Sequence, residues 1–199
     1  MAKRSVSRHE ERMGPSFSQR LNAFETGERT WRADEDGLRL VHPGGSGVVW
    51  AWRDVVEMRL TYAATSLKPW RRKAWFRMAD GETVAFDNGH FKDVGQFEDR
   101  SEGFKAVVRE AIGRVDAARP DARWRLGTPP ASYWAQVAFV AVAVAFLIWV
   151  VVLIPVSAWP GAAWDKLAVA AALVPGGCLW AYISRPRKTT ASGMLEALG

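Results

Sequence analysis

Two long uncharged stretches in the C-terminal part constrain this chain most strongly. Asp, Glu, Lys and Arg are all absent from Leu126 to Trp164 and again from Leu167 to Ser184. Inside the first stretch, residues 133–156 form an apolar run. A helix rises about 1.5 Å per residue, so this run is long enough to cross a hydrocarbon core of about 30 Å. We therefore expect a transmembrane helix at 133–156.

A second apolar run at 162–183 predicts a second, shorter transmembrane helix. Its first turn carries Asp165 and Lys166, and the long side chain of Lys166 can reach the membrane interface. Pro175 interrupts the run and predicts a kink. Together the two runs predict a helical hairpin with a short external loop at 157–161. A buried helical pair in a soluble protein is the alternative, but a chain of 199 residues could hardly cover both helices.

Aromatic residues fall where such a hairpin would meet the two membrane interfaces. Trp and Tyr prefer that depth because their rings have an apolar body and a polar tip. They occur at the start of the first helix, around the loop and at the end of the second helix. The expected interface anchors are Tyr133, Trp134, Trp159, Trp164, Trp180 and Tyr182.

Basic residues on either side of the hairpin predict its orientation, because membrane proteins keep Lys and Arg near the cytoplasmic ends of their helices. The region between the helices offers only Lys166. Three basic residues lie before the first helix and three after the second: Arg119, Arg123, Arg125, Arg185, Arg187 and Lys188. We therefore expect a multi-pass protein of the cell (inner) membrane, with both termini in the cytoplasm and a cytoplasmic tail at 184–199.

The charge balance limits the partners. The chain has 27 Lys and Arg against 21 Asp and Glu, a formal net charge of +6. A basic excess suits an anionic lipid surface or nucleic acid, but no nucleic-acid reading helix or RNA-binding aromatic motif is visible. We expect the lipid bilayer, and not nucleic acid, as a partner. Residues 1–26 lack the apolar core of a signal peptide and predict a polar, partly disordered leader.

Alternating apolar and polar residues between about Gly27 and Asn88 predict a β-rich domain. Asp36-Gly37, the glycine-rich run 42–47 and Asp80-Gly81 carry turn chemistry. Arg72 is a misfit on an otherwise apolar strand face. The expected strands are 30–34, 38–42, 48–52, 55–62, 70–78 and 82–88.

A helix at 101–117 is expected to follow the strands. Ser101 is a plausible N-cap, and Glu102 suits the positive end of the helix dipole. Apolar residues recur at the three-and-four spacing of one helix face: Phe104, Val107, Val108, Ala111, Ile112 and Val115. A linker at 118–132, rich in Pro and Arg, leads into the first membrane helix.

The stretches 49–55, 57–60, the basic strand 70–77 and the final helix resemble the pleckstrin-homology-like (PH-like) fold. The first of them holds a W-x-D-V junction at Trp52-Arg53-Asp54-Val55. Similar domains occur in bacterial, mostly uncharacterised proteins, fused to membrane helices. The resemblance covers roughly 27–117 and implies an α+β fold, a strongly bent antiparallel sheet closed by a C-terminal helix. A generic small antiparallel β-barrel with a capping helix is the alternative. One strand is unaccounted for, either within 63–68 or before Gly27.

Basic and aromatic residues interleave along the fifth expected strand. Each Lys or Arg close to an anionic leaflet gains about 1 kcal/mol, so this strand suits anionic lipid head groups. A solvated strand that protects a sheet edge is the alternative. The acidic first hairpin at 34–37 differs from the basic hairpin with which many PH domains bind phosphoinositides. The expected lipid- or partner-binding residues are Lys68, Trp70, Arg71, Arg72, Lys73, Trp75 and Arg77.

We expect a non-enzymatic interaction or scaffold module that binds a protein partner, a second copy of itself or the lipid surface. The sequence shows no catalytic motif, no cofactor motif and no His or Cys at metal-ligand spacing, so no metal or cofactor is predicted. The alternative is an accessory subunit of a membrane enzyme or transport complex. An enzymatic role would rest on the polar segment Asp87–Asp93, where Asp87 and His90 surround a turn.

Overall fold

The chain divides into two units, and the first is built from two segments that are far apart in sequence. It combines Met1–Leu126 with Arg187–Gly199, whereas the second unit is Gly127–Pro186. The computed structural model describes residues 14–153, 168, 175, 178–179 and 181–199. The C-terminal segment thus belongs to the same unit as the N-terminal strands.

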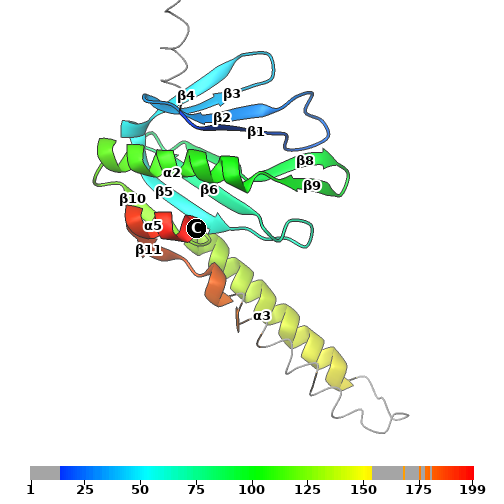
Figure 1. Cartoon of the computed structure of the whole chain (residues 1–199). Helices are drawn as coiled ribbons and strands as arrows, with labels where there is room; N and C mark the ends of the chain where they lie inside the picture. The colour runs from blue at the N-terminus through cyan, green and yellow to red at the C-terminus, as the bar shows by residue number, and fades with distance from the viewer. Residues whose placement is uncertain (1–13, 154–167, 169–174, 176–177, 180) are drawn as a thin grey trace, which may run out of the picture. The chain divides into compact units, whose positions relative to one another are not determined.

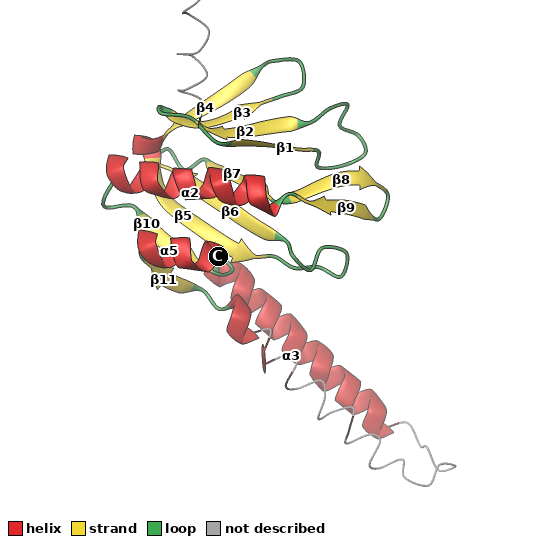
Figure 2. Ribbon diagram, viewed as in Figure 1, coloured by secondary structure: helices red, strands yellow, loops and turns green. Residues whose placement is uncertain are grey.

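A four-stranded antiparallel sheet opens the first unit (Figures 1 and 2). Its strands lie in sequence order: β1 (Ser16–Gln19), β2 (Arg29–Ala33), β3 (Gly37–Val41) and β4 (Gly47–Ala51). The β3–β4 turn uses Gly44 and Gly45 at positive φ, a conformation that glycine adopts without strain. The turn residues of the sequence therefore fix where these strands end.

A five-stranded mixed sheet follows, in the order β11-β10-β5-β6-β7. A 3₁₀ turn, η1 (Trp52–Asp54), leads into it from β4. Its strands are β5 (Val55–Tyr62), β6 (Arg72–Met78), β7 (Thr83–Asp87), β10 (Arg123–Leu126) and β11 (Arg187–Thr189). β10 runs parallel to β5, and the other neighbours are antiparallel. A separate hairpin consists of β8 (Gly89–Asp93) and β9 (Gln96–Asp99).

Two helices complete the first unit. α2 (Ser101–Ala118) buries all six apolar residues that the helical spacing predicts. α5 (Ala191–Leu198) packs against α2 and β10 and fully buries Met194 and Leu198. Its N-terminus is capped by Thr190, whose hydroxyl oxygen accepts a hydrogen bond from the Gly193 amide at 3.2 Å.

Phe86 on β7 lies at the centre of the aromatic core. Its ring stacks on Trp31 with centroids 4.5 Å apart and on Phe76 at 5.8 Å, and it meets Phe104 edge-on at 5.7 Å. Pairs of this kind add about 0.5–1.5 kcal/mol beyond the area that they bury. Because the rings come from β2, β6, β7 and α2, one cluster joins both sheets to the main helix.

The second unit contains α3 (Pro130–Leu153), and within it Pro130–Val150 is long and apolar enough to cross a membrane. Only 6% of the most apolar window is buried, unlike the core helix of a soluble protein. Tyr133 is 8% exposed, and its hydroxyl donates to the Ala181 carbonyl at 3.2 Å, whereas Trp134 and Tyr182 are exposed. The expected helix at 162–183 lies largely outside the described residues, as do Trp159, Trp164 and Trp180.

The α+β class is confirmed, but the closed β-barrel alternative is wrong. The strands that the structure describes form three separate sheets with open edges, and the β10–β5 pair is parallel. The six expected strands are present, although β6 begins at Arg72, so Trp70 lies in the preceding loop. The segment Asp87–Asp93 is not a polar loop, because most of it forms β8.

Three segments that the sequence analysis places outside the β-rich domain contribute strands or a helix to it. β1 lies inside the expected leader 1–26 and pairs with β2. β10 lies inside the expected linker 118–132, and β11 and α5 lie inside the expected tail 184–199. These elements are only three to eight residues long. Each is stabilised by distant parts of the chain, so local periodicity does not reveal it.

Candidate functional site: a cationic sheet face

Alternate residues of the five-stranded sheet point away from the core and form what we call the outer face. Cross-strand partners share a face, so the strand register shows which side chains are neighbours. One row runs across the sheet through Lys188, Arg125, Arg59 and Trp75, and the next runs through Arg123, Glu57 and Arg77. With Lys73, the outer face carries six cations: Arg59, Lys73, Arg77, Arg123, Arg125 and Lys188.

Glu57 is the carboxylate at the centre of this outer face. Its two oxygens lie 3.0 Å from Arg59 Nη2, 3.1 Å from Arg125 Nε and 3.7 Å from Arg123 Nε. Three guanidinium groups therefore share one negative charge. The Arg59 side chain is only 8% exposed, whereas that of Arg123 is 57% exposed. The cluster keeps a net positive charge and presents it mainly through β10.

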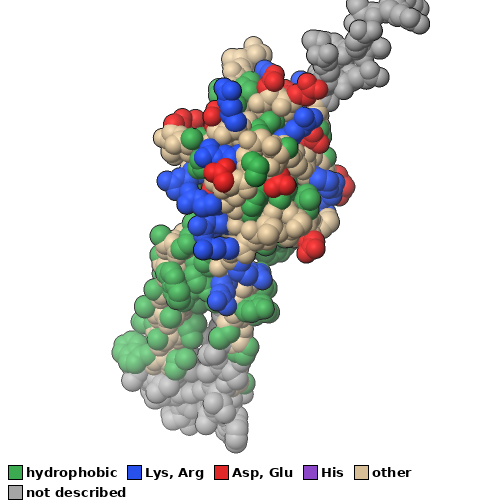
Figure 3. Space-filling model, turned by 90° about the vertical axis from the view of Figure 1, so that its left-hand side faces the viewer, with side chains coloured by type: hydrophobic (Ala, Val, Ile, Leu, Met, Phe, Trp, Pro, Cys, Tyr) green, Lys and Arg blue, Asp and Glu red, His purple; other side chains and the backbone are tan. Residues whose placement is uncertain are grey.

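The flanking cations of the outer face are open to solvent. Lys188, at the end of the first row, and Arg77, at the end of the second row, are exposed. Lys and Arg side chains gather along one side of this unit in the space-filling view (Figure 3). Six cations and two carboxylates, Glu57 and the Lys73 register partner Asp87, leave four net positive charges on the outer face. Such a face attracts polyanions and phosphate-bearing surfaces.

Lys73 and Trp75 form a cation–π pair on the outer face. Lys73 Nζ lies 3.9 Å from the centroid of the Trp75 ring. Burial lowers the pKa of the Lys73 ammonium, and Arg71 lowers it further, while Asp87 raises it. Trp75 is half-buried, and a Trp ring next to cations suits a lipid surface, because Trp prefers the interfacial depth.

The other expected binding residues are engaged inside the first unit. Arg71 makes a two-pronged contact with Asp87, with Nε at 2.7 Å from Oδ2. Arg72 donates from Nη1 to the carbonyl of Ala197 at 3.1 Å, at the C-terminal end of α5. The misfit on the apolar strand face is therefore a cap for a helix that comes from the far end of the chain.

Lys68 and Trp70 both lie in the β5–β6 loop, residues 63–71, and not on the outer face. Lys68 Nζ lies 3.6 Å from the centroid of the Phe97 ring on β9, and burial lowers the pKa of its ammonium. Trp70 is half-buried, and its carbonyl accepts from the Asn88 amide at 3.3 Å. Of the seven expected binding residues, only Lys73, Trp75 and Arg77 share the outer face.

Asp87 and His90, the residues of the enzymatic alternative, are held in separate contacts. Asp87 Oδ1 accepts from the Gly89 amide at 2.9 Å, and its other oxygen binds Arg71. His90 Nδ1 accepts from the Arg20 amide at 3.1 Å, so it helps to join β8 to the chain after β1. Burial lowers the pKa of His90, with a further lowering by Arg100. These contacts give both side chains a structural task.

Asn88, between these two residues, is fully buried and links three elements. Its side-chain oxygen accepts from the Arg72 amide at 2.8 Å. Its amide group donates to Asp99 at 3.0 Å and to the Ser101 hydroxyl at 2.7 Å. The polar residues at 87–90 thus tie β6 to the beginning of α2.

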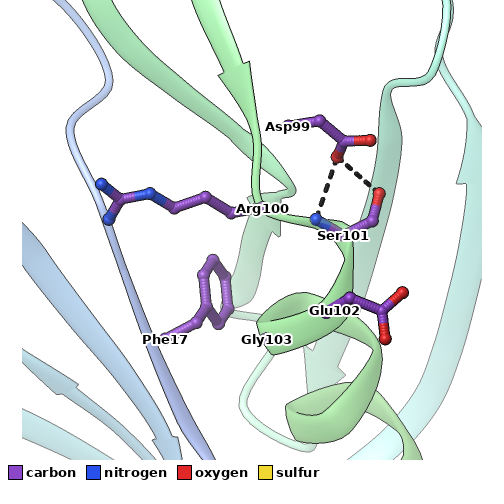
Figure 4. Close-up of a pocket in the computed structure, with 6 residues that line it drawn as sticks. All are labelled: Phe17, Asp99, Arg100, Ser101, Glu102 and Gly103. Carbon is purple, nitrogen blue, oxygen red and sulfur yellow. Dashed lines mark hydrogen bonds between the residues drawn. The ribbon is translucent and has the colours of Figure 1, made fainter.

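A shallow hollow of about 340 Å³ lies at the N-terminus of α2 (Figure 4). It is lined by Phe17, Asp99, Arg100, Ser101, Glu102 and Gly103. Three of its polar residues already have partners: Asp99 accepts from the Ser101 amide at 2.9 Å, and Arg100 binds Glu28 at 2.9 Å. Phe17 approaches so closely that a side chain on Gly103 would collide with it. The hollow is therefore a consequence of the close packing between the first turn of α2 and β1.

Sequence reasoning missed four of the six cations of the outer face, namely Arg59, Arg123, Arg125 and Lys188. In the sequence, Arg59 looks like an ordinary outward-facing residue of its strand. Arg123, Arg125 and Lys188 look like residues that set the orientation of a membrane helix. The available signal was the alternation in Arg123-Trp124-Arg125-Leu126, which is typical of a half-buried strand.

Among the residues that the structure describes, no group of three His, Cys, Asp or Glu side chains could hold a metal ion. A scan against protein families and a search of curated proteins found no match to this chain. The functional interpretation therefore rests on the geometry of the outer face and on the apolar helix α3.

Proposed function

We propose that this chain is a multi-pass protein of the bacterial cell membrane, whose cytoplasmic domain is a non-enzymatic module that binds anionic lipid head groups. The observation that carries the proposal is the outer face, where six cations outnumber the two carboxylates Glu57 and Asp87. Two of its strands are also the chain's connection to the apolar segment, since β10 ends at Leu126 and α3 begins at Pro130. The outer face would hold the domain, or a partner bound to the domain, against the leaflet.

The pairing of β10 with β11 supports two membrane crossings. Leu126 and Arg187 are register partners, so the chain that leaves the domain at one returns to it at the other. If α3 crosses the membrane once, a second crossing is needed for this return, and the apolar run 162–183 supplies it. An even number of crossings leaves both termini on one side, which the basic flanks identify as the cytoplasm.

The charge of the outer face supports an anionic lipid surface as the partner. Each Lys or Arg near such a surface contributes about 1 kcal/mol, and the attraction decays within about 10 Å at an ionic strength of 0.1 M. Buried Arg59 adds little, but the exposed cations on β6, β10 and β11 act together. The contact should therefore depend on anionic lipid and weaken with salt.

The order of elements supports a PH-like domain as the framework of this module. Four strands, three further strands, the β8–β9 hairpin and then α2 follow one another in sequence, so a helix comes after the strands as the resemblance implies. β10, β11 and α5 would be additions to that framework. β10 and β11 extend the second sheet beyond β5 and enlarge the cationic outer face.

Lipid proximity can be measured in the full chain reconstituted into vesicles. Cys178 is the only cysteine, so a Cys178→Ala background accepts one labelled cysteine at a chosen site. Thr83→Cys places a fluorophore beside Arg77 on the outer face, and Glu35→Cys places one in the acidic β2–β3 turn. Lipids with a spin-labelled head group then report proximity by quenching.

We expect stronger quenching at position 83 than at position 35 in vesicles that contain phosphatidylglycerol. The difference should shrink in pure phosphatidylcholine, in high salt and in the Lys73→Glu, Arg77→Glu double variant. If quenching at position 83 did not change with lipid charge or salt concentration, the proposed binding of anionic lipid by the outer face would be refuted. If the double variant then also lost a co-purifying acidic protein, the outer face would be a protein-binding surface instead.

A further inference from the structure

The β5–β6 loop projects from the end of the sheet at which the chain leaves and re-enters the domain. β5 and β10 are parallel, with Leu60 beside Leu126, so both strands run toward the same end. β5 continues into the loop after Tyr62, while β10 stops at Leu126 and β11 begins opposite it at Arg187. The loop and both connections to the apolar segment therefore share one end of the five-stranded sheet.

The loop is an ordered turn that exposes an apolar tip. Thr65 and Lys68 exchange backbone hydrogen bonds of 3.1 and 3.0 Å, and the Ala63 amide donates to the Arg71 carbonyl at 2.9 Å. Leu67, inside this closed turn, is 62% exposed. The backbone bonds hold it outward, away from the core of the unit.

The base of the loop is fixed to its neighbours. Lys68 lies over the Phe97 ring, Arg71 binds Asp87, and the Tyr62 hydroxyl bonds to the Pro69 carbonyl. A loop held at three points keeps its tip in one place. The exposure of Leu67 is therefore a property of the fold and not of a loose segment.

Composition distinguishes this loop from the other exposed apolar tips of the domain. Phe24 and Val94 are 95% and 84% exposed, but each lies next to a carboxylate, Glu25 and Asp93 respectively. The loop 63–71 reads AATSLKPWR and contains basic and aromatic residues without any acidic one. An apolar tip with basic and aromatic flanks suits the interface of an anionic leaflet, where acidic neighbours would be repelled.

We infer that the β5–β6 loop is a second membrane contact, in which Leu67 enters the interfacial layer of the lipid bilayer. The inference rests on the proposed function, because the domain must be held at a membrane. In this arrangement the loop inserts an apolar side chain into the bilayer interface, and the outer face binds the anionic head groups by charge. The domain would then meet the lipid through two distinct surfaces that can be tested separately.

The experiment uses the full chain in nanodiscs that contain phosphatidylglycerol, again in the Cys178→Ala background. An environment-sensitive fluorophore is attached at Leu67→Cys, and Val94→Cys is the matched apolar tip. We expect the emission at position 67 to shift to shorter wavelength and to be quenched by lipids spin-labelled near the head group. Emission at position 94 should stay that of a water-exposed probe.

Water-like emission at position 67 would overturn the inference, and an equal shift at position 94 would overturn its assignment to this loop. The label at Thr83→Cys separates this failure from failure of the proposed function, because it reports the outer face alone. Hydrogen exchange without any label gives a second measurement. The amides of 63–71 should exchange more slowly in nanodiscs with Leu67 than in nanodiscs with the Leu67→Asp variant, and equal rates would contradict the inference.

Discussion

Leu126 and Arg187 are adjacent register partners in neighbouring strands, although the whole of the second unit separates them in sequence. The first unit is consequently a discontinuous domain that is complete only when its last segment has returned. Met194 and Leu198, which this segment supplies, are fully buried beside α2 and β10. The apolar segment is thus an insertion between two strands rather than an addition to a finished domain.

Removal of the inserted segment should leave a folded, soluble domain. If residues 1–126 are joined to 187–199 through an Asn-Gly turn, the new hairpin connects strands that are already antiparallel neighbours. We expect cooperative urea unfolding and well-dispersed amide signals in the NMR spectrum. Residues 1–126 alone should unfold at much lower urea, because they lack β11 and α5. Equal stability of the two fragments would contradict the role of the C-terminal segment.

The core contribution of α5 can be measured by truncation of its buried side chains in this joined domain. Met194→Ala and Leu198→Ala should each lower the free energy of unfolding by about 2–5 kcal/mol, as buried large-to-small changes do. Leu195→Ala is the control, since Leu195 lies on the same helix but is 39% exposed. Its effect should stay within about 0.5 kcal/mol, the usual range at surface positions. Similar losses at positions 194 and 195 would show that α5 does not pack as described.

The sequence is informative where a pattern repeats within one element. Phe104 to Val115 recur at helical spacing over about three turns, and all six predicted positions are buried. The alternation in 55–62 and 72–78 likewise predicts the buried positions Met58, Leu60, Ala74, Phe76 and Met78. It fails at the two ends of 55–62, where a β-bulge buries Val55 in place of Val56 and Tyr62 is 51% exposed. Local patterns of this length identify the main helix and the central strands without knowledge of their neighbours.

The sequence is less informative where a distant segment provides the stabilisation. β10 is only four residues long and reads as a basic linker, and α5 is short and reads as a tail. The outer face joins cations from both of these regions, so only the register of β5, β10 and β11 brings them together. Arg72 was the one local clue, a cation on an apolar strand face that calls for an acceptor from elsewhere.

The contact between Arg72 and the end of α5 should be worth a measurable part of the stability. Its guanidinium bonds the Ala197 carbonyl, where the negative end of the helix dipole also favours a cation. Arg72→Met keeps the apolar stem and should cost about 1.5–3 kcal/mol, the range of hydrogen bonds to charged groups. Arg77→Met, from the exposed outer face of the same strand, is the control and should cost less than about 0.5 kcal/mol. Urea unfolding of the joined domain measures both, and equal costs would contradict the capping role.

His90 should make the stability of the domain fall on mild acidification. Burial, followed by Arg100, lowers the pKa of this imidazole from its ordinary value of 6.5. The unfolded state therefore binds the proton more readily than the folded state, so the free energy of unfolding decreases as the pH falls below about 6.5 and levels off below the folded-state pKa. His90→Asn keeps an acceptor for the Arg20 amide but cannot titrate, and it should flatten this slope.

Urea unfolding of the joined domain between pH 5 and pH 7.5 checks the role of His90. The pKa of the Glu28 carboxyl is lowered from 4.5, mainly by its hydrogen bond to Arg100. Glu28 therefore changes the stability only below about pH 4.5, which is outside this window. His42→Asn, in the glycine-rich β3–β4 turn, controls for the loss of an imidazole as such. An unchanged slope in His90→Asn would show that other groups cause the pH dependence.

The return of the chain at Arg187 leads to a sharp expectation for membrane topology. If two crossings lie between Leu126 and Arg187, a cysteine in the connecting loop and a cysteine in α5 must be on opposite sides of the membrane. In the Cys178→Ala background, a membrane-impermeant maleimide added to intact cells should label Ser157→Cys but not Ser192→Cys. Permeabilised cells should allow labelling of Ser192→Cys, which is exposed near the start of α5. Labelling of both positions in intact cells would rule out a cytoplasmic domain, and labelling of neither would place the loop on the cytoplasmic side. Because β11 and α5 are integral parts of the domain, the position of Ser192 reports the side on which the entire first unit folds.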